Sequence, residues 1–246
     1  MLIVANWKAH VEDSATAKKL FAASKRLAAL GSRIVLAPPA PLLGALSVRN
    51  KSAVAFAAQD VSATAGGAHT GEITAQIYAA AGATYAIIGH SERREAGDTD
   101  ALIAEKLAHA LAQGLAPILC VGERERDGEG RYLGVVREEL TLAMESLAPK
   151  DRAKVIVAYE PLWAIGRSAE HAIGQNDLTE MALYIRKVLA ELLPGKSSKQ
   201  SVVLYGGSVE PSNIRDLAAS SGVDGFLIGH ASTDPRTLVL LLKQLR

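Results

Sequence analysis

The sequence has one cysteine, almost no net charge and no long hydrophobic run. A single cysteine, Cys120, excludes an internal disulfide framework and makes a reducing compartment the expectation. The net charge of +1 at pH 7 gives no basic field for nucleic acid or an anionic membrane surface. No apolar stretch approaches the roughly 18 residues that cross a bilayer. We therefore expect a soluble, cytoplasmic protein with no nucleic acid and no membrane among its partners.

What the sequence does have is a regular alternation of short apolar runs and longer amphipathic segments. The runs have the length and composition of buried strands, and the segments between them have helical periodicity. The expected strands are Leu2–Trp7, Arg33–Pro38, Val54–Gln59, Thr84–Gly89, Ala116–Val121, Lys154–Glu160, Val202–Gly206 and Gly225–Gly229. The clearest helices are Ser14–Leu30, Thr99–Gln113, Arg137–Leu147, Asn176–Leu193, Pro211–Ser220 and Asp234–Leu245. Helices after the second and third strands are less distinct.

This alternation predicts an α/β fold with parallel strands and right-handed crossovers. Eight strand and helix units in 246 residues fit a closed (β/α)8 barrel better than an open sheet. No linker divides the chain, because the polar Pro194–Lys199 stretch reads as a loop and the charged Glu123–Arg131 segment as a mobile loop. We predict a single-domain (β/α)8 barrel over residues 1–246.

In such a barrel the chemistry belongs at the carboxyl ends of the strands. Glu160 ends the sixth run, and Pro161 directly after it stiffens the exit. The following loop carries Trp163 and Ile165 and reaches Gly166, so it is apolar where surface loops are usually polar. Such a loop is typical of a lid over a dry site. The alternative is a buried structural glutamate followed by an ordinary loop.

Lys8 follows the first strand and is expected at the same mouth, where an ammonium attracts anions and stabilises developing negative charge. A lone lysine is more often a solvated surface group, so the functional reading depends on Glu160 and His90 nearby. A buried lysine that forms a Schiff base is the rival functional reading.

His90 follows the fourth strand and precedes a short predicted helix for which Ser91 is the expected cap. A ring nitrogen that faces helix amides accepts their hydrogen bonds, which favours a neutral imidazole able to shuttle protons. Ser91 beside His90 does not indicate a hydrolase, because no nucleophile elbow surrounds it. No metal site is expected, because Cys120 and the other histidines lack ligand spacing. These are His10, His69, His109, His171 and His230.

Glycine-containing turns end the last two strands, at Tyr205–Ser208 and at Gly229. Exposed backbone amides at this position of a barrel commonly bind phosphate. A single glycine turn more often marks only a tight bend, and two on neighbouring strands strengthen the prediction.

Taken together, these motifs make the sequence similar to the triosephosphate isomerase family over essentially its whole length. The motifs occur in the family's order. They are Asn6–Lys8, Gly67–Glu72, Ile88–Arg94, Cys120–Glu123, Tyr159–Gly166 and Tyr205–Val209.

The resemblance implies a TIM barrel that interconverts dihydroxyacetone phosphate and D-glyceraldehyde 3-phosphate through an enediolate, without a cofactor, in glycolysis and gluconeogenesis. It implies that Glu160 is the base, His90 the electrophile and Lys8 the charge stabiliser. It further implies that Asn6 is a neighbouring site residue and that four backbone amides hold the phosphate of the sugar substrate. These amides belong to Gly166, Ser208, Gly229 and His230.

The resemblance also implies a homodimer, in which the loop from His69 to Glu72 inserts Thr70 into the neighbouring site. Some positions depart from the family pattern. His230 replaces a glycine near the phosphate, and Arg167–Ala169 alter the lid. Asp60 and His10 each replace an asparagine near the expected subunit contact.

Three other functions remain open at this stage. The same proton shuttle on a four-carbon ketose phosphate is suggested by His230 and the altered lid. A Schiff-base lyase would use Lys8 as its nucleophile. A phosphate-binding module without turnover is disfavoured by the joint presence of Lys8, His90 and Glu160.

Overall fold

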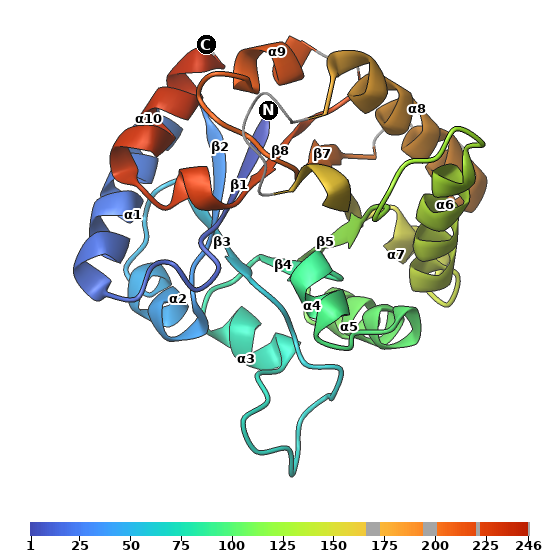
Figure 1. Ribbon diagram of the computed structural model, residues 1–246. Helices are drawn as coiled ribbons and strands as arrows, with labels where there is room; N and C mark the ends of the chain where they lie inside the picture. The colour runs from blue at the N-terminus through green and yellow to red at the C-terminus, as the bar shows by residue number, and fades with distance from the viewer. Residues whose placement is uncertain (166–172, 194–200, 220–221, 246) are drawn as a thin grey trace.

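The computed structural model describes residues 1–165, 173–193, 201–219 and 222–245, and its centre is a closed barrel of eight parallel strands (Figure 1). Each strand pairs with the strands before and after it in sequence, and β8 pairs with β1 to close the ring. The strands are β1 Leu2–Asn6, β2 Arg33–Ala37, β3 Ala55–Ala58, β4 Tyr85–Ile88, β5 Ala116–Val121, β6 Ile156–Tyr159, β7 Val203–Tyr205 and β8 Gly225–Ile228. The predicted fold class is confirmed.

Helices surround the barrel and connect successive strands. The α-helices are α1 Ser14–Ala29, α2 Ala40–Ser47, α3 Ala75–Ala80, α4 Ser91–Glu95, α5 Asp100–Ala112, α6 Arg131–Met144, α7 Pro149–Arg152, α8 Gln175–Leu192, α9 Ile214–Ala219 and α10 Pro235–Gln244. Two described 3-10 turns, η1 Leu162–Ala164 and η4 His230–Ser232, follow β6 and β8. In the described ranges, no helix has the length and apolar character needed to cross a membrane.

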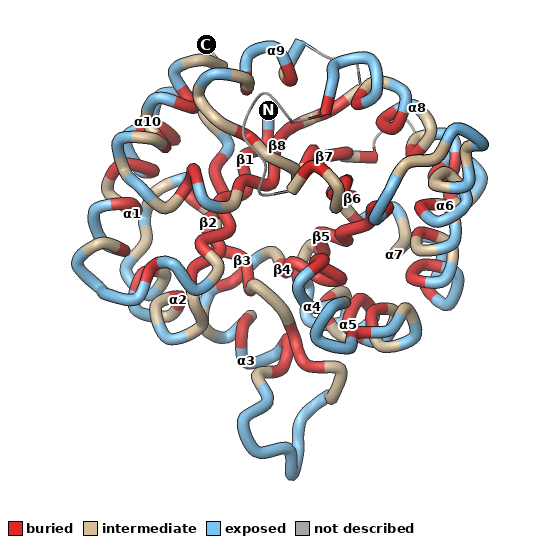
Figure 2. Tube along the Cα trace, in the orientation of Figure 1, coloured by how far each residue is buried: buried red, intermediate tan, exposed pale blue. Residues whose placement is uncertain are grey.

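Alternate residues of each strand face opposite sides of the barrel wall. Val4, Val35 and Leu227 belong to a small apolar cluster made of strand residues, which fills the interior. Their neighbours Ile3, Ile34 and others contact the helices in the larger cluster. Both faces of each strand are therefore buried away from water, which explains why the strands appear in the sequence as continuous apolar runs. Figure 2 shows the same arrangement, with buried strands inside and helices exposed on their outer surfaces.

Side-chain caps begin several helices where the sequence has a suitable residue. Asp13, Thr74, Thr99 and Asp234 each accept a hydrogen bond from an amide of the first turn of α1, α3, α5 and α10. Such caps satisfy amides that have no partner within the helix. The predicted ends of α1, α5 and α10 are accordingly correct to within one residue.

The predicted start of α6 is wrong by six residues, because the helix begins at Arg131 and not at Arg137. Its N-cap is Gly130 in the left-handed conformation (φ 77°), with no capping side chain of its own. Asp127 instead accepts the Arg131 amide from further back in the charged segment. Glu123, at the start of that charged segment, is buried.

Closure of the barrel requires glycine at position 225. A Cβ placed there would lie 1.9 Å from the Leu2 carbonyl oxygen of the adjacent strand. The two backbones can therefore approach only because no side chain separates them.

We predict that Gly225→Ala lowers the free energy of unfolding by at least about 2–3 kcal/mol, because the added methyl displaces backbone. Urea denaturation followed by circular dichroism measures the change. Gly134→Ala is the control, because that α6 position has no atom within 4 Å of the added Cβ. The control is expected to be neutral or stabilising, and equal losses in both variants would contradict the argument.

Candidate active site

A cavity of about 360 Å³ opens at the carboxyl ends of the strands. It brings together residues from β1, β4, β6, β7 and β8 that lie far apart in the sequence. All the predicted site residues that the structure describes line it, namely Asn6, Lys8, His90, Glu160, Ser208, Gly229 and His230. Gly166 and the altered lid positions Arg167–Ala169 lie outside the described residues.

The carboxylate of Glu160 is almost completely buried, with 2% of its surface exposed. Oε2 accepts a hydrogen bond from the Ser91 amide at 3.1 Å, and Oε1 lies 3.4 Å from Nε2 of His90. The base therefore has a defined orientation beside the imidazole. Gly206 leaves room for it, since a Cβ there would lie 2.9 Å from Cγ of Glu160.

His90 is itself the N-cap of α4, so the expectation that Ser91 caps this helix is wrong. Nδ1 of His90 accepts the Glu92 amide at 3.2 Å, as expected for a ring nitrogen that faces helix amides. An accepting Nδ1 carries no proton, so in the neutral ring the proton is on Nε2. That nitrogen faces Glu160, and the imidazole is in place to donate a hydrogen bond into the cavity.

Lys8 is held by contacts that the sequence did not reveal. Its Nζ donates to Glu92 Oε1 at 2.8 Å, and its carbonyl oxygen accepts from the Gln59 side chain at 2.9 Å. Burial opposes ionisation of Glu92, but the hydrogen bond and charge of Lys8 outweigh it, so the pKa of Glu92 lies below its usual value. The ion pair thus fixes the ammonium at the mouth of the cavity.

The backbone of Lys8 is strained. Among the residues that the structure describes, Lys8 is the sole non-glycine with a positive φ, at 47°. This conformation is uncommon for a side chain of its size and is maintained by the surrounding contacts. The amide of Lys8 donates to Oδ1 of Asn6 at 3.1 Å, which gives Asn6 a role in holding the turn.

The beginning of the loop after Glu160 is anchored from the opposite side by Glu123. Oε1 of Glu123 accepts from Trp163 Nε1 at 2.8 Å and from the Tyr159 hydroxyl at 2.7 Å. The Ser208 hydroxyl donates to the carbonyl oxygen of Ala164 at 2.8 Å. Sequence reasoning missed Glu123, because the charged residues that follow it indicate a solvated loop.

At the outer rim of the cavity His10 faces His230, with ring centroids 5.4 Å apart in an edge-to-face arrangement. Both side chains are exposed and both line the cavity. His10 therefore belongs to the mouth of the site, a position that the sequence reading assigned only to the region of a subunit contact.

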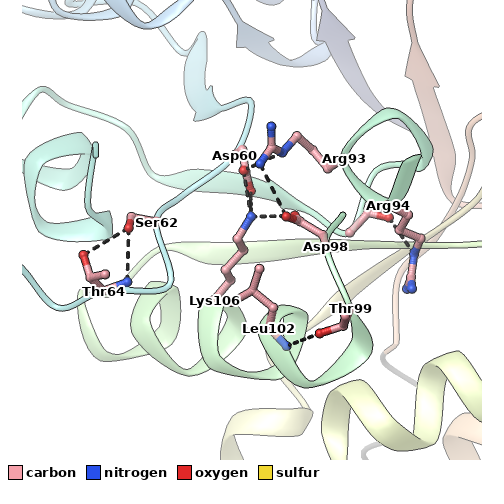
Figure 3. A network of polar contacts seen from close by, with 10 residues as sticks. Asp60, Ser62, Thr64, Arg93, Arg94, Asp98, Thr99, Leu102 and Lys106 are labelled. Carbon is pink, nitrogen blue, oxygen red and sulfur yellow. Dashed lines mark hydrogen bonds and ion pairs between the residues drawn. The ribbon is translucent and has the colours of Figure 1, made fainter. Parts of the chain in front are cut away.

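Asp60, the other departure from the family pattern, belongs to a cluster of charged side chains beside α4 (Figure 3). Nζ of Lys106 lies 2.8 Å from Oδ2 of Asp60 and 2.5 Å from Oδ2 of Asp98, and Arg93 also contacts both carboxylates. Burial raises the pKa of Asp60 even though Lys106 opposes the shift. This cluster holds α4 against α5 and so supports the helix that His90 begins.

The described residues provide no set of metal ligands at this site. Across the described ranges, no three His, Cys, Asp or Glu side chains are grouped so that they could hold a metal ion. The available groups are a buried carboxylate, a neutral imidazole and an ammonium at one mouth of a barrel. This combination defines a class, the barrel enzymes that move protons on small anionic molecules.

Comparison with known proteins identifies the family within this class. The family model described as triosephosphate isomerase matches residues 1–245. The triosephosphate isomerase of Thermus thermophilus is 40% identical over 247 residues, covering 99% of this chain and 98% of the relative. That of Herpetosiphon aurantiacus is 40% identical and covers 98% of both chains. That of Acidiphilium cryptum is 41% identical over 239 residues, covering 94% and 92%. The chain belongs to the triosephosphate isomerase family, and the resemblance inferred from its motifs is confirmed.

We predict that Lys106→Met costs about 3–5 kcal/mol in the free energy of unfolding, because it leaves the buried carboxylate of Asp98 without its ammonium. Lys154→Met is the matched control, because Lys154 forms a 2.8 Å ion pair with Asp151 at the surface. An exposed pair contributes no more than about 1 kcal/mol. Chemical denaturation of both variants gives the comparison, and similar costs would show that burial of the cluster is unimportant.

Proposed function

We propose that this chain, as one (β/α)8 barrel domain over residues 1–246, interconverts dihydroxyacetone phosphate and D-glyceraldehyde 3-phosphate. The reaction is an intramolecular aldose-ketose isomerisation in glycolysis and gluconeogenesis, and its place in the cell is the cytoplasm. Family membership supports this proposal. The observation that carries it is the buried Glu160 carboxylate, 3.4 Å from Nε2 of His90 in a cavity that also contains Lys8.

The reaction moves a proton between adjacent carbons. Glu160 removes the proton from one carbon, and the electron pair of that bond forms the enediolate. His90 moves protons between the two oxygens through Nε2, and Lys8 stabilises the negative charge. Glu160 then returns a proton to the other carbon. General base action is worth about 10² to 10⁴ in rate, and an aimed charge-stabilising donor about 3–4 kcal/mol.

Backbone amides hold the phosphate at the ends of β7 and β8. The proposal assigns this role to Ser208, Gly229 and His230, which line the cavity, and to Gly166 of the following loop. The enediolate can expel its own phosphate, so the apolar loop after Glu160 has to exclude water and hold the phosphate out of line for this elimination. No cofactor is required, because every step is a proton transfer between groups that the chain supplies.

A four-carbon ketose phosphate is the second candidate substrate. The His10 and His230 rings at the rim favour it, because they change the shape of the cavity beside the proposed phosphate-binding amides. Catalytic efficiencies on both substrates decide between the candidates. A Schiff-base lyase is disfavoured because Nζ of Lys8 is engaged by the Glu92 carboxylate at 2.8 Å and is not free to attack a carbonyl. Binding of phosphate ligands without turnover would instead support the non-enzymatic reading.

We predict that Glu160→Gln lowers kcat on glyceraldehyde 3-phosphate by at least about a thousandfold, because the amide cannot act as a base. A coupled isomerase assay of wild type and variant side by side measures the effect. Glu125→Gln, at an exposed carboxylate of a neighbouring loop, is the control and is expected to be unchanged. A Glu160→Gln variant that kept the wild-type kcat would show that Glu160 is not the base.

The loop between β3 and α3 supports a homodimer. It projects away from the barrel, and residues 65–72 are exposed (Figures 1 and 2). A second copy that received this loop would cover its tip, with Thr70 entering the neighbouring site. Family membership favours the same assembly.

We predict that the protein sediments as a dimer at micromolar concentrations and that Thr70→Arg shifts it toward monomer, because a long charged side chain desolvates poorly in an interface. Sedimentation velocity over a range of concentrations measures both. Ala190→Arg, at an exposed position of α8, is the control. A stable and fully active wild-type monomer would overturn the proposed assembly.

A further inference from the structure

Glu139 lies behind the active site and has no part in the chemistry proposed above. It is on α6, and its side chain is 14% exposed. Oε2 accepts the Gly122 amide at 2.8 Å, while Oε1 lies 3.6 Å from Nη1 of Arg94. A half-buried carboxylate with these two partners connects the backbone after β5 to Arg94 of α4.

The first segment carries the base. Gly122 follows β5 and contacts the backbone of Glu160 so closely that an added Cβ would lie 1.9 Å from its carbonyl oxygen. The Glu160 amide also donates to the Val121 carbonyl oxygen at 2.8 Å. A displacement of Gly122 therefore displaces the backbone of Glu160 as well, because no side chain lies between the two backbones.

The second segment carries the imidazole. Nε of Arg94 donates to the Gly89 carbonyl oxygen at 3.0 Å, directly before His90. Nη1 of Arg94 pairs with Asp100 at 2.6 Å, and Nη2 lies 3.5 Å from the Cys120 carbonyl oxygen. Arg94 thus attaches the end of β4 to β5 and α5, and Glu139 contacts it from the remaining side.

We propose that Glu139 is a positioning residue that fixes the separation of His90 and Glu160, by binding the Gly122 amide on one side and the Arg94 guanidinium on the other. The inference rests on the proposed function, because the two residues whose separation it sets are the proposed proton carriers. Glu139 itself does not contact the cavity in which substrate would bind; that cavity does not include it.

The ionised form of Glu139 makes these contacts best, because a carboxylate accepts from the Gly122 amide and its negative charge attracts the Arg94 guanidinium. Burial raises the pKa of Glu139 to about 7, against the opposing effects of Arg94 and the Gly122 amide; Asp100 and Glu160 raise it further. A second cavity of about 520 Å³, lined by Glu139, Arg94 and Glu160, lies beside the carboxyl group. Protonation near neutral pH would weaken both contacts.

The groups that face Glu139 come from four neighbouring elements. They are Arg94 of α4, Asp100 of α5, Cys120 of β5 and Glu160 after β6. On the α8 side, the acidic groups Asp177, Glu180 and Glu191 pair with Arg126 and Arg137. The charge balance around Glu139 therefore depends chiefly on Arg94.

The test compares Glu139→Gln with Glu138→Gln, an exposed carboxylate on the same helix. We expect Glu139→Gln to lower kcat about tenfold, as small displacements of reacting groups do. KM and the inhibition constant of inorganic phosphate are expected to stay within about twofold, because Glu139 does not contact the proposed phosphate amides. Glu138→Gln is expected to match wild type in all three.

The pH profile of kcat separates positioning from simple loss of packing. In wild type we expect kcat to fall as pH decreases through about 7, where Glu139 gains a proton. Glu139→Gln cannot gain one and is expected to lack this step. Glu139→Asp keeps the charge, so it is expected to keep the pH step at a reduced kcat. This variant also tests the positioning role if Glu139→Gln fails to fold.

An unchanged kcat in Glu139→Gln, a parallel loss of phosphate binding, or retention of the pH step would each overturn the inference. Wild-type activity on triose phosphates is measured separately and decides the proposed function. An active wild type with an insensitive Glu139→Gln variant rejects only the positioning role, and an inactive wild type rejects the function on which that role rests.

Discussion

Closure of the barrel between β1 and β8 is the constraint on which the rest of the structure depends. Gly225 contacts the backbone of Leu2 without an intervening side chain, and the sheet is left with no free edge. All eight strands therefore end at the same mouth. Lys8, His90 and Glu160 share one cavity because of this closure, since they come from strands that are separated by up to 152 positions in the chain.

Within the barrel, the polar groups of the site are ordered by partners that do not line the cavity. Glu92 holds Lys8, and the Glu92 amide fixes the His90 ring. The Ser91 amide holds Glu160. A buried charge without a partner costs several kcal/mol, so the Ser91 amide confines the buried Glu160 carboxylate to a narrow range of positions. The short helix α4 supplies three of the contacts, which makes its attachment through Arg93 and Arg94 central to the geometry of the site.

The strands were predictable to within two residues at each end, because burial on both faces leaves a continuous apolar run. Helices with side-chain caps, such as α1 and α5, were equally clear. The start of α6 was not, because its cap is a left-handed glycine and its first turn follows a charged segment. The cap of α4 was assigned to Ser91 because serine is the usual capping residue, whereas the backbone turns one residue earlier and the imidazole of His90 takes that place.

The sequence by itself determined the barrel, the family and the residues that end its strands, since these depend on local pattern and on motif order. Only the tertiary structure decided which groups hold them. Glu92 on Lys8, Glu123 on Trp163 and Glu139 on Gly122 are contacts between residues at least 17 positions apart. Each is a glutamate among other charged residues, so no local signal separates it from a solvated side chain. What distinguishes them is a contact with one particular donor, and that donor is a neighbour only once the chain has folded.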